Sequence, residues 1–256
     1  MNYLDAALKA SEGAKRIVMS YYNKEKSIRW KGEIDPVTNA DIASEKYIVK
    51  KLKSYFPDHS FVTEEEGLLN TGSEYRWIID PIDGTTSFSH NFPLFSISIA
   101  LYKKDKPMVG VVNVPYLREV FSAEAGKGAF LNGEKIHVSG IDTMQKALVS
   151  TGFPYSRLSS DVDNLKYFNK MAKKVGEIRR TGSAAIDTCY VACGRFDAYW
   201  ELGLKVMDTA AGLLILTEAG GRFTDFSGKD TADFSQIVAS NSILHKQMLD
   251  ILKEAD

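Results

Sequence analysis

Residues 77–93, WIIDPIDGTTSFSHNFP, join an apolar strand to a polar turn, and few other stretches of the chain restrict its fold as much. The run Trp77 to Ile79 is typical of a strand buried inside a covered sheet. Pro81 predicts that this strand stops at Asp80-Pro81, because proline has no N–H to donate to a ladder. Asp83 follows in the loop, which we expect to be exposed.

The residues after Asp83 favour binding of an anion. Gly84-Thr85-Thr86 suits the first turn of a helix, where free N–H groups point outward and attract a group such as phosphate. Acids and an anion in one turn repel each other unless a cation lies between them. We therefore expect a hard divalent ion held by oxygens, Mg²⁺ or Mn²⁺. The residues alone leave open the alternative of two ordinary Asp-Pro and Asp-Gly turns.

Further acids fall at the junctions between predicted elements. Thr38 and Asp41 have the spacing of a capping box that opens a helix ending before Pro57. The predicted strand Phe61-Val62-Thr63 runs directly into Glu64, Glu65 and Glu66. Asp208 opens a helix over residues 207–219. Each acid could be a helix-capping or loop residue, but together at one end of the sheets they would form an oxygen-rich cage for two or three divalent ions.

The hydrophobic pattern divides the chain into two parts. Residues 4–21 predict a helix, residues 24–37 a loop, and residues 95–138 an antiparallel meander with a tight turn at Asn132-Gly133. After a polar segment at residues 139–143, strands and helices alternate. We therefore predict an α/β protein with an α+β N-terminal half, residues 1–142, and an α/β C-terminal half, residues 143–256.

Composition narrows the class of protein. The chain has 256 residues, 44% of them hydrophobic, and a formal net charge of −1. That charge gives no general attraction for nucleic acid or an anionic membrane, so neither is expected as a partner. The start of the chain lacks the apolar core of a signal peptide, and Cys189 and Cys193 have the spacing of helical core residues. We expect a cytoplasmic protein.

Three segments resemble the signatures of the inositol monophosphatase family, the lithium-sensitive Mg²⁺-dependent sugar and polyol phosphatases. They are WIIDPIDGTTSF, EIRRTGSAA at residues 177–185 and MDTAAGLLILTEAGG at residues 207–221. The similarity extends along essentially the whole chain. It implies a layered αβαβα sandwich, two to three Mg²⁺ ions and, commonly, a homodimer.

The resemblance also implies site residues. The implied metal ligands are Glu64, Glu65, Asp80, the carbonyl of Ile82, Asp83 and Asp208. The implied substrate contacts are Asp83, Gly84, Thr85, Ala184, Glu201 and Asp208, with Glu201 as an ionised acid at the edge of a sheet. Thr85, Glu64 and Asp41 are implied in catalysis, with Asp41 orienting the Thr85 hydroxyl. Lys31 corresponds to a lysine in a mobile loop that approaches the metals.

The family comparison leaves the substrate open. Inositol-1-phosphate is the expected substrate, with fructose-1,6-bisphosphate, histidinol phosphate and NADP as alternatives. A non-catalytic binding protein on the same fold is a further alternative. The family usually has Trp where this chain has Met207, which puts substrate preference in doubt. We expect Phe153-Pro154-Tyr155 and Arg157 to line the entrance or a dimer contact, or to form a plain loop.

Overall fold

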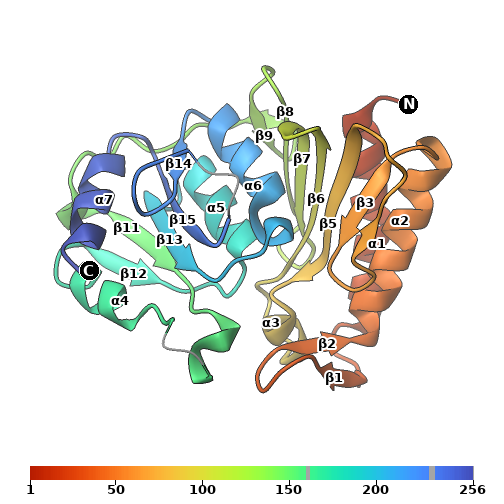
Figure 1. Ribbon diagram of the computed structural model, residues 1–256, viewed down its shortest axis with the longest axis horizontal. Helices are drawn as coiled ribbons and strands as arrows, with labels where there is room; N and C mark the ends of the chain where they lie inside the picture. The colour runs from red at the N-terminus through yellow and green to blue at the C-terminus, as the bar shows by residue number, and fades with distance from the viewer. Residues whose placement is uncertain (160–161, 231–233, 256) are drawn as a thin grey trace.

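The computed structural model describes residues 1–159, 162–230 and 234–255, and these form two large sheets and the helices that cover them (Figure 1). The first sheet has eight strands in the order β10-β9-β8-β7-β6-β5-β3-β4, all antiparallel except the β3–β5 pair. Its strands are β3 (Ser60–Thr63), β4 (Leu68–Leu69), β5 (Tyr75–Asp83), β6 (Ser96–Lys103), β7 (Lys106–Val114), β8 (Glu119–Glu124), β9 (Ala129–Leu131) and β10 (Glu134–Lys135).

Two long helices cover the outer face of this sheet, on the right in Figure 1: α1 (Tyr3–Tyr21) and α2 (Asn39–Tyr55). Alanines at helical spacing, among them Ala7, Ala10 and Ala14, are fully buried on α1 and allow its backbone to approach its neighbours closely. The Asn2 side chain caps α1 by accepting a hydrogen bond of 2.7 Å from the Asp5 N–H, which satisfies one of the free donors of the first turn.

The second sheet has five strands in the order β12-β11-β13-β15-β14. They are β11 (Leu148–Thr151), β12 (Glu177–Arg179), β13 (Ala198–Leu202), β14 (Arg222–Thr224) and β15 (Gln236–Ser240). Helices α5 (Ala184–Ala192) and α6 (Val206–Glu218) lie between the two sheets, while α4 (Leu165–Met171) and α7 (His245–Lys253) cover the far face. Three buried apolar clusters fill the spaces between these five layers. The predicted αβαβα sandwich is confirmed.

Helix α6 is apolar on almost every side, which is typical of a helix buried in a central layer. Residues Thr209 to Leu216 are all buried, and they contact both sheets. The rigid packing of α6 fixes the position of the acid at its N-terminus, Asp208.

Three sequence predictions about local structure are wrong. Residues 24–37 are not a loop, because they contain the hairpin of β1 (Ile28–Trp30) and β2 (Pro36–Thr38). The strand at residues 77–79 does not stop at Pro81 but continues to Asp83, because a bulge between Asp80 and Asp83 accommodates the proline. The last strand of the meander ends at Lys135, before the predicted limit at residue 138.

The chain passes from the first sheet to the second between Lys135 and Leu148, a span that includes the predicted boundary at residues 139–143. The division into domains 1–142 and 143–256 stays a prediction. In the described part of the chain, no helix is both long and apolar enough to cross a membrane.

Candidate functional site

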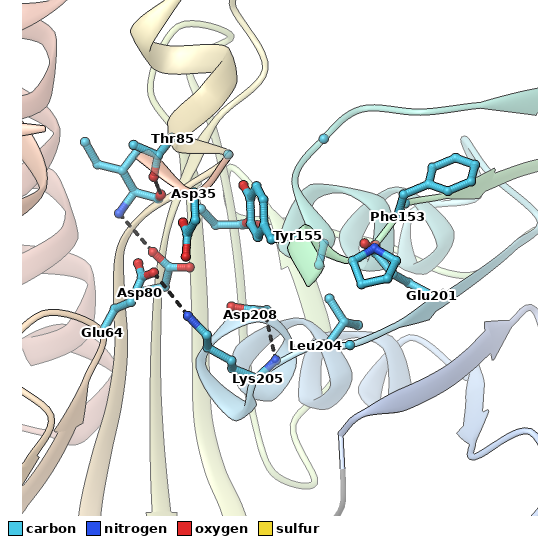
Figure 2. A pocket seen from close by; sticks show the side chains of 18 of the residues that line it. Asp35, Glu64, Asp80, Thr85, Phe153, Tyr155, Glu201, Leu204, Lys205 and Asp208 are labelled. Atoms are coloured by element: carbon cyan, nitrogen blue, oxygen red, sulfur yellow. Dashed lines mark hydrogen bonds and ion pairs between the residues drawn. The ribbon is translucent and has the colours of Figure 1, made fainter. Parts of the chain in front are cut away.

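A cleft between the two halves of the chain collects acidic side chains from distant parts of the sequence (Figure 2). Its cavity volume is about 90 Å³. The N-terminal half contributes Asp35, Glu64, Asp80, Ile82, Asp83, Gly84 and Thr85 to the lining, and the C-terminal half contributes Phe153, Pro154, Tyr155, Arg180, Ala184, Glu201, Lys205 and Asp208. Most of the predicted site residues therefore do lie together.

The bulge at the end of β5 places Asp80 and Asp83 in the cleft. Asp80 is 2% exposed, and its Oδ1 accepts a hydrogen bond of 3.0 Å from the Ile82 N–H. Asp83 is also buried, which contradicts the expected exposed loop. Its Oδ2 accepts hydrogen bonds from the Ser183 hydroxyl at 2.6 Å and the Ala185 N–H at 2.8 Å. Asp83 thus connects the first sheet to the N-terminus of α5.

Asp41 accepts a hydrogen bond from the hydroxyl of Thr85. The predicted capping box is present, with Asp41 Oδ2 accepting hydrogen bonds from the N–H of Thr38 at 2.8 Å and from its hydroxyl at 2.5 Å. Asp41 Oδ1 lies 3.1 Å from Thr85 Oγ1, which also lies 2.9 Å from the carbonyl oxygen of Ile82. The Thr85 hydroxyl therefore points its proton toward Asp41, at the buried N-terminus of α2, or toward Ile82, and its lone pairs are left for other partners.

Gly84 shapes the turn in which we predict anion binding. Its φ of 90° lies in the left-handed region, where a side chain is strained. A Cβ atom at this position would also lie 3.2 Å from the carbonyl oxygens of Gly182 and Leu94. Helix α3 (Thr85–Ser89) begins immediately afterwards, so its first N–H groups have no partner within the helix. The turn therefore offers backbone donors in a space that only glycine leaves open.

Two ammonium groups lie beside the acids (Figure 2 shows Lys205). Lys31 Nζ is 3.1 Å from Glu64 Oε1 and also pairs with Glu65, while Lys205 Nζ is 3.7 Å from Glu64 Oε1. Asp208 does not pair with the Lys205 ammonium; its Oδ2 accepts a hydrogen bond of 2.7 Å from the Lys205 backbone N–H.

The acids are not drawn together into a finished metal cage. Within residues 1–159, 162–230 and 234–255, no three His, Cys, Asp or Glu side chains are close enough to hold an ion. The donor set nevertheless fits a hard cation, because it consists of oxygens and because ammonium groups already lie against Glu64. Asp80, Asp83, Asp208 and Glu64 are the side chains that would hold Mg²⁺.

Burial and mutual repulsion raise the pKa of several of these acids. Burial raises the pKa of Asp41 and of Asp83 to about 6, and burial together with the nearby Asp83 raises the pKa of Asp208 to about 8. Burial and Glu64 hold the pKa of Asp80 well above its usual range. For Lys31 burial acts in the opposite direction, but Glu65 and Glu64 raise its pKa overall.

These shifts predict that the metal-free protein loses stability as the pH rises. The folded acids have raised pKa values, so between pH ~4 and ~8 the folded state binds more protons than the unfolded chain, and the free energy of unfolding falls with pH. We expect the melting temperature in EDTA to drop by a few degrees or more between pH 5 and pH 8, measured by calorimetry. Saturating Mg²⁺ should largely remove the drop. A melting temperature in EDTA that stays constant or rises between pH 5 and pH 8 would contradict the raised pKa values of these acids.

The opposite wall of the cleft carries Ala184 and Glu201, both predicted to face the substrate. Glu201 does not lie at a sheet edge, because it pairs with Ile237 inside β13, the middle strand of its sheet. The Tyr199 hydroxyl donates a hydrogen bond of 2.5 Å to Glu201 Oε2. A Cβ atom on Gly152 would lie 2.1 Å from Glu201 Oε1, so glycine leaves room for this carboxyl.

The charge of the Glu201 carboxyl depends on its burial. Burial raises its pKa to about 7, although the hydrogen bond from Tyr199 opposes the rise. At neutral pH the carboxyl is therefore partly protonated, and it can donate as well as accept a hydrogen bond.

Some predicted residues lie outside the cleft lining. Asp41 contacts Thr85 of the cleft through a hydrogen bond, and Glu65 pairs with Lys31 while its N–H donates a hydrogen bond to Glu45. Met207 is buried in the central layer, where its effect on Asp208 can only be indirect. The Arg157 guanidinium donates to the Pro154 carbonyl oxygen at 3.2 Å and does not line the cleft.

Other cleft residues had no predicted role. Asp35 and Lys205 line it, and Lys205 immediately precedes α6, which carries Asp208, a position that could have indicated this lysine. Arg180 lines it too, and its guanidinium lies 5.3 Å from the ring centre of Phe153. Glu45 accepts hydrogen bonds of 2.9 Å from the N–H groups of Glu65 and Glu66, which fixes the acidic turn from behind. Glu45 is four residues after Asp41 on α2, so helical spacing predicts the same face.

Comparison with known proteins shows to which family this chain is similar. The profile described as "Inositol monophosphatase family" matches residues 2–256. A protein named Nus factor SuhB from Haemophilus influenzae is 39% identical over 98% of this chain and 95% of its own length. A protein from Aquifex aeolicus named fructose-1,6-bisphosphatase/inositol-1-monophosphatase is also 39% identical, over 98% of this chain and 96% of its own length.

Solved structures show the same similarity along the whole chain. An IMPase from Thermotoga maritima superposes with a TM-score of 0.91 and 36% identity, and the match covers all of this chain and 98% of that one. Since the similarity extends over both sheets and all layers, it includes every element that contributes to the cleft.

Proposed function

Since the chain belongs to the inositol monophosphatase family and is a phosphoric monoester hydrolase, we propose that it hydrolyses a small sugar or polyol phosphate with two to three Mg²⁺ ions. The observation that carries this proposal is the position of Asp80, Asp83 and Asp208 beside the Gly84-Thr85 turn. Oxygen ligands for hard cations and backbone donors for a phosphate share one cleft.

The residues divide the chemistry between them. Bound Mg²⁺ would polarise the phosphate and lower the pKa of a coordinated water. The N–H groups at the start of α3 hold the phosphate oxygens as fixed dipoles that need no reorganisation. Thr85 Oγ1 gives its proton to a hydrogen bond with Asp41 or Ile82, so its lone pairs are free to accept one from an attacking water. Asp41, whose pKa burial raises to about 6, is suited to receive a proton near neutral pH.

We propose inositol-1-phosphate as the main substrate. The partly protonated carboxyl of Glu201 can both accept from and donate to ring hydroxyls, and the Ala184 methyl leaves room beside it. A polyol ring offers the hydroxyls that such a wall recognises. The hydrogen bond that the Tyr199 hydroxyl donates to Glu201 Oε2 keeps the carboxyl in one orientation.

A second candidate, fructose-1,6-bisphosphate, is favoured by two cations. Lys205 and Arg180 line the same cleft on the side of the C-terminal half, where they could bind a second phosphate.

We also propose a homodimer, which light scattering at micromolar concentration would detect.

Phosphate release from a panel of monoesters tests the proposed substrate. The panel contains inositol-1-phosphate, fructose-1,6-bisphosphate, histidinol phosphate and NADP, each with Mg²⁺. We expect the highest kcat/KM for inositol-1-phosphate. A higher value for another compound replaces it as the substrate, and hydrolysis of none favours a binding protein on this fold.

Replacing Glu201 with Gln separates substrate recognition from chemistry. We expect kcat/KM for inositol-1-phosphate to fall by roughly 10–100-fold, because the Gln amide is never ionised and the charge-assisted hydrogen bond that the Glu201 carboxylate accepts from a ring hydroxyl, worth about 1.5–3 kcal/mol, is lost. Hydrolysis of p-nitrophenyl phosphate, which has no ring hydroxyls, should change little. Equal losses on both substrates would mean that Glu201 supports the architecture of the cleft. No loss on either would remove it from recognition.

A further inference from the structure

A second cavity, of about 250 Å³, lies between α6 and the first sheet, away from the acidic cleft. Its walls are mainly apolar, and Ile78, Tyr102, Leu213, Leu214, Phe223 and Phe234 form most of them. The cavity lies where the N-terminal sheet meets elements of the C-terminal half. Such junctions are common places for small-molecule sites.

The second cavity lies on the same face of β5 as the acidic cleft. Side chains alternate along a strand, so Arg76, Ile78 and Asp80 all point toward α6. Arg76 and Ile78 line the cavity. Asp80, which lies ~13 Å from Arg76 along the strand, lines the cleft. Helix α6 runs beside both, with Asp208 at one end and Leu213, Leu214 and Thr217 over the cavity.

One charged side chain of this cavity is poorly paired. Arg76 is directly opposite Tyr102 in the ladder, and its guanidinium makes a long ion pair of 3.7 Å with Asp105, whose side chain is 91% exposed. The Nε atom of Arg76 is buried and has no hydrogen-bond partner among the residues that the structure describes. A guanidinium has five N–H donors, and the Arg76 side chain is 40% exposed, so donors besides Nε remain available to a ligand.

We propose that this cavity binds a small amphipathic carboxylate, whose apolar ring system occupies the cavity and whose carboxylate pairs with Arg76. Apolar cavities of ~150 Å³ bind benzene, so a cavity of about 250 Å³ has room for a two-ring compound. Arg76 matches a carboxylate because its planar fork binds two oxygens at once. A cationic ligand is disfavoured, because the Arg76 guanidinium would repel it, while Asp105 is 91% exposed and its charge is screened by solvent.

Binding would act on the helix that carries Asp208. The Tyr102 hydroxyl donates to the carbonyl oxygen of Ala210 at 3.4 Å, and the Ser98 hydroxyl donates to that of Met207 at 3.4 Å. A ring packed against Tyr102 and Leu214 therefore stiffens the contact between the sheet and α6. The ligand should raise the melting temperature, because it binds the folded state only.

Calorimetric titration with 2-naphthoate tests the proposal, on the full chain with Mg²⁺ and saturating inorganic phosphate, which blocks the acidic cleft. We expect one saturable site. Arg76→Met, which keeps an apolar side chain of similar length, should weaken binding by about tenfold or more. Arg16→Met is the matched control, since Arg16 is 78% exposed on α1 and, among the residues that the structure describes, forms an ion pair with Glu12 alone, at 3.7 Å. Arg16→Met should bind 2-naphthoate with the same affinity as the wild type.

Two further measurements keep the test decisive if Arg76→Met folds poorly. The neutral analogue 2-naphthamide should bind wild type more weakly than 2-naphthoate does, and Leu213→Phe, which fills the cavity, should weaken both compounds. The proposal is overturned if 2-naphthoate does not bind, if phosphate displaces it, or if Arg76→Met and Leu213→Phe both bind it as tightly as the wild type. None of these outcomes depends on phosphatase activity.

Discussion

Replacing Asp80 with Asn should lower kcat/KM by at least about 10³-fold while the fold stays intact. Asn keeps an oxygen that can accept the hydrogen bond from the Ile82 N–H, so the bulge at the end of β5 is preserved. The lost negative charge weakens the hold on a cation whose Lewis-acid contribution is several kcal/mol, and each 1.36 kcal/mol is tenfold in rate. Steady-state phosphate release at saturating Mg²⁺ measures the effect.

The same variant should be more stable than the wild type when metal is absent. Asp80 is buried beside other acids that raise its pKa, and a neutral amide removes this repulsion. The melting temperature in EDTA at pH 8 is therefore expected to rise. Asp250→Asn, an exposed change on α7, is the control and should change neither quantity by much. Near-normal Mg²⁺-dependent turnover in Asp80→Asn would refute the metal assignment.

Replacing Thr85 with Ala should reduce kcat by roughly 10²–10⁴-fold, the range for a positioned proton-transfer group. The hydroxyl links the buried Asp41 to the cleft through its 3.1 Å contact, and no other described side chain bonds to this carboxylate except Thr38. Affinity for Mg²⁺, measured by calorimetry, should change little, since Thr85 carries no charge.

Two variants separate this role from a structural one. Thr85→Ser keeps the hydroxyl and should retain most of the activity. Ser89→Ala removes an exposed hydroxyl from the same short helix, where it bonds only to the Thr86 carbonyl oxygen, and should behave like the wild type. If Thr85→Ala changes metal affinity alone, the pairing of Thr85 with Asp41 has no catalytic role.

The strands and long helices could be predicted because their apolar periodicity reflects burial. Helix α1 and the meander of β6 to β9 repeat this pattern over many residues, and the turn at Asn132-Gly133 has a specific backbone requirement. The β1–β2 hairpin was missed because Ile28, Arg29 and Trp30 are all exposed, so no alternation marks the strand. The continuation of β5 past Pro81 was missed because it depends on a bulge, and a bulge arises from the pairing of two strands rather than from the local sequence.

The positions of the acids could be predicted from element junctions, but their surroundings could not. Asp83 precedes a glycine and predicts an exposed turn, yet Ser183 and Ala185 reach it from 100 or more residues away and bury it. The raised pKa of Glu201 depends on burial by a sheet that forms only in the folded chain. Lys205 approaches Glu64 from the other half of the chain, so no local pattern indicates their contact.

The most direct test of the central claim is phosphate release from inositol-1-phosphate by the wild-type protein, first stripped with EDTA and then titrated with Mg²⁺. We predict no turnover above background in EDTA and a saturable rise as Mg²⁺ is added, with the rise abolished in Asp80→Asn. Turnover that is equal with EDTA and with Mg²⁺ would contradict a reaction that depends on metal held by Asp80, Asp83 and Asp208.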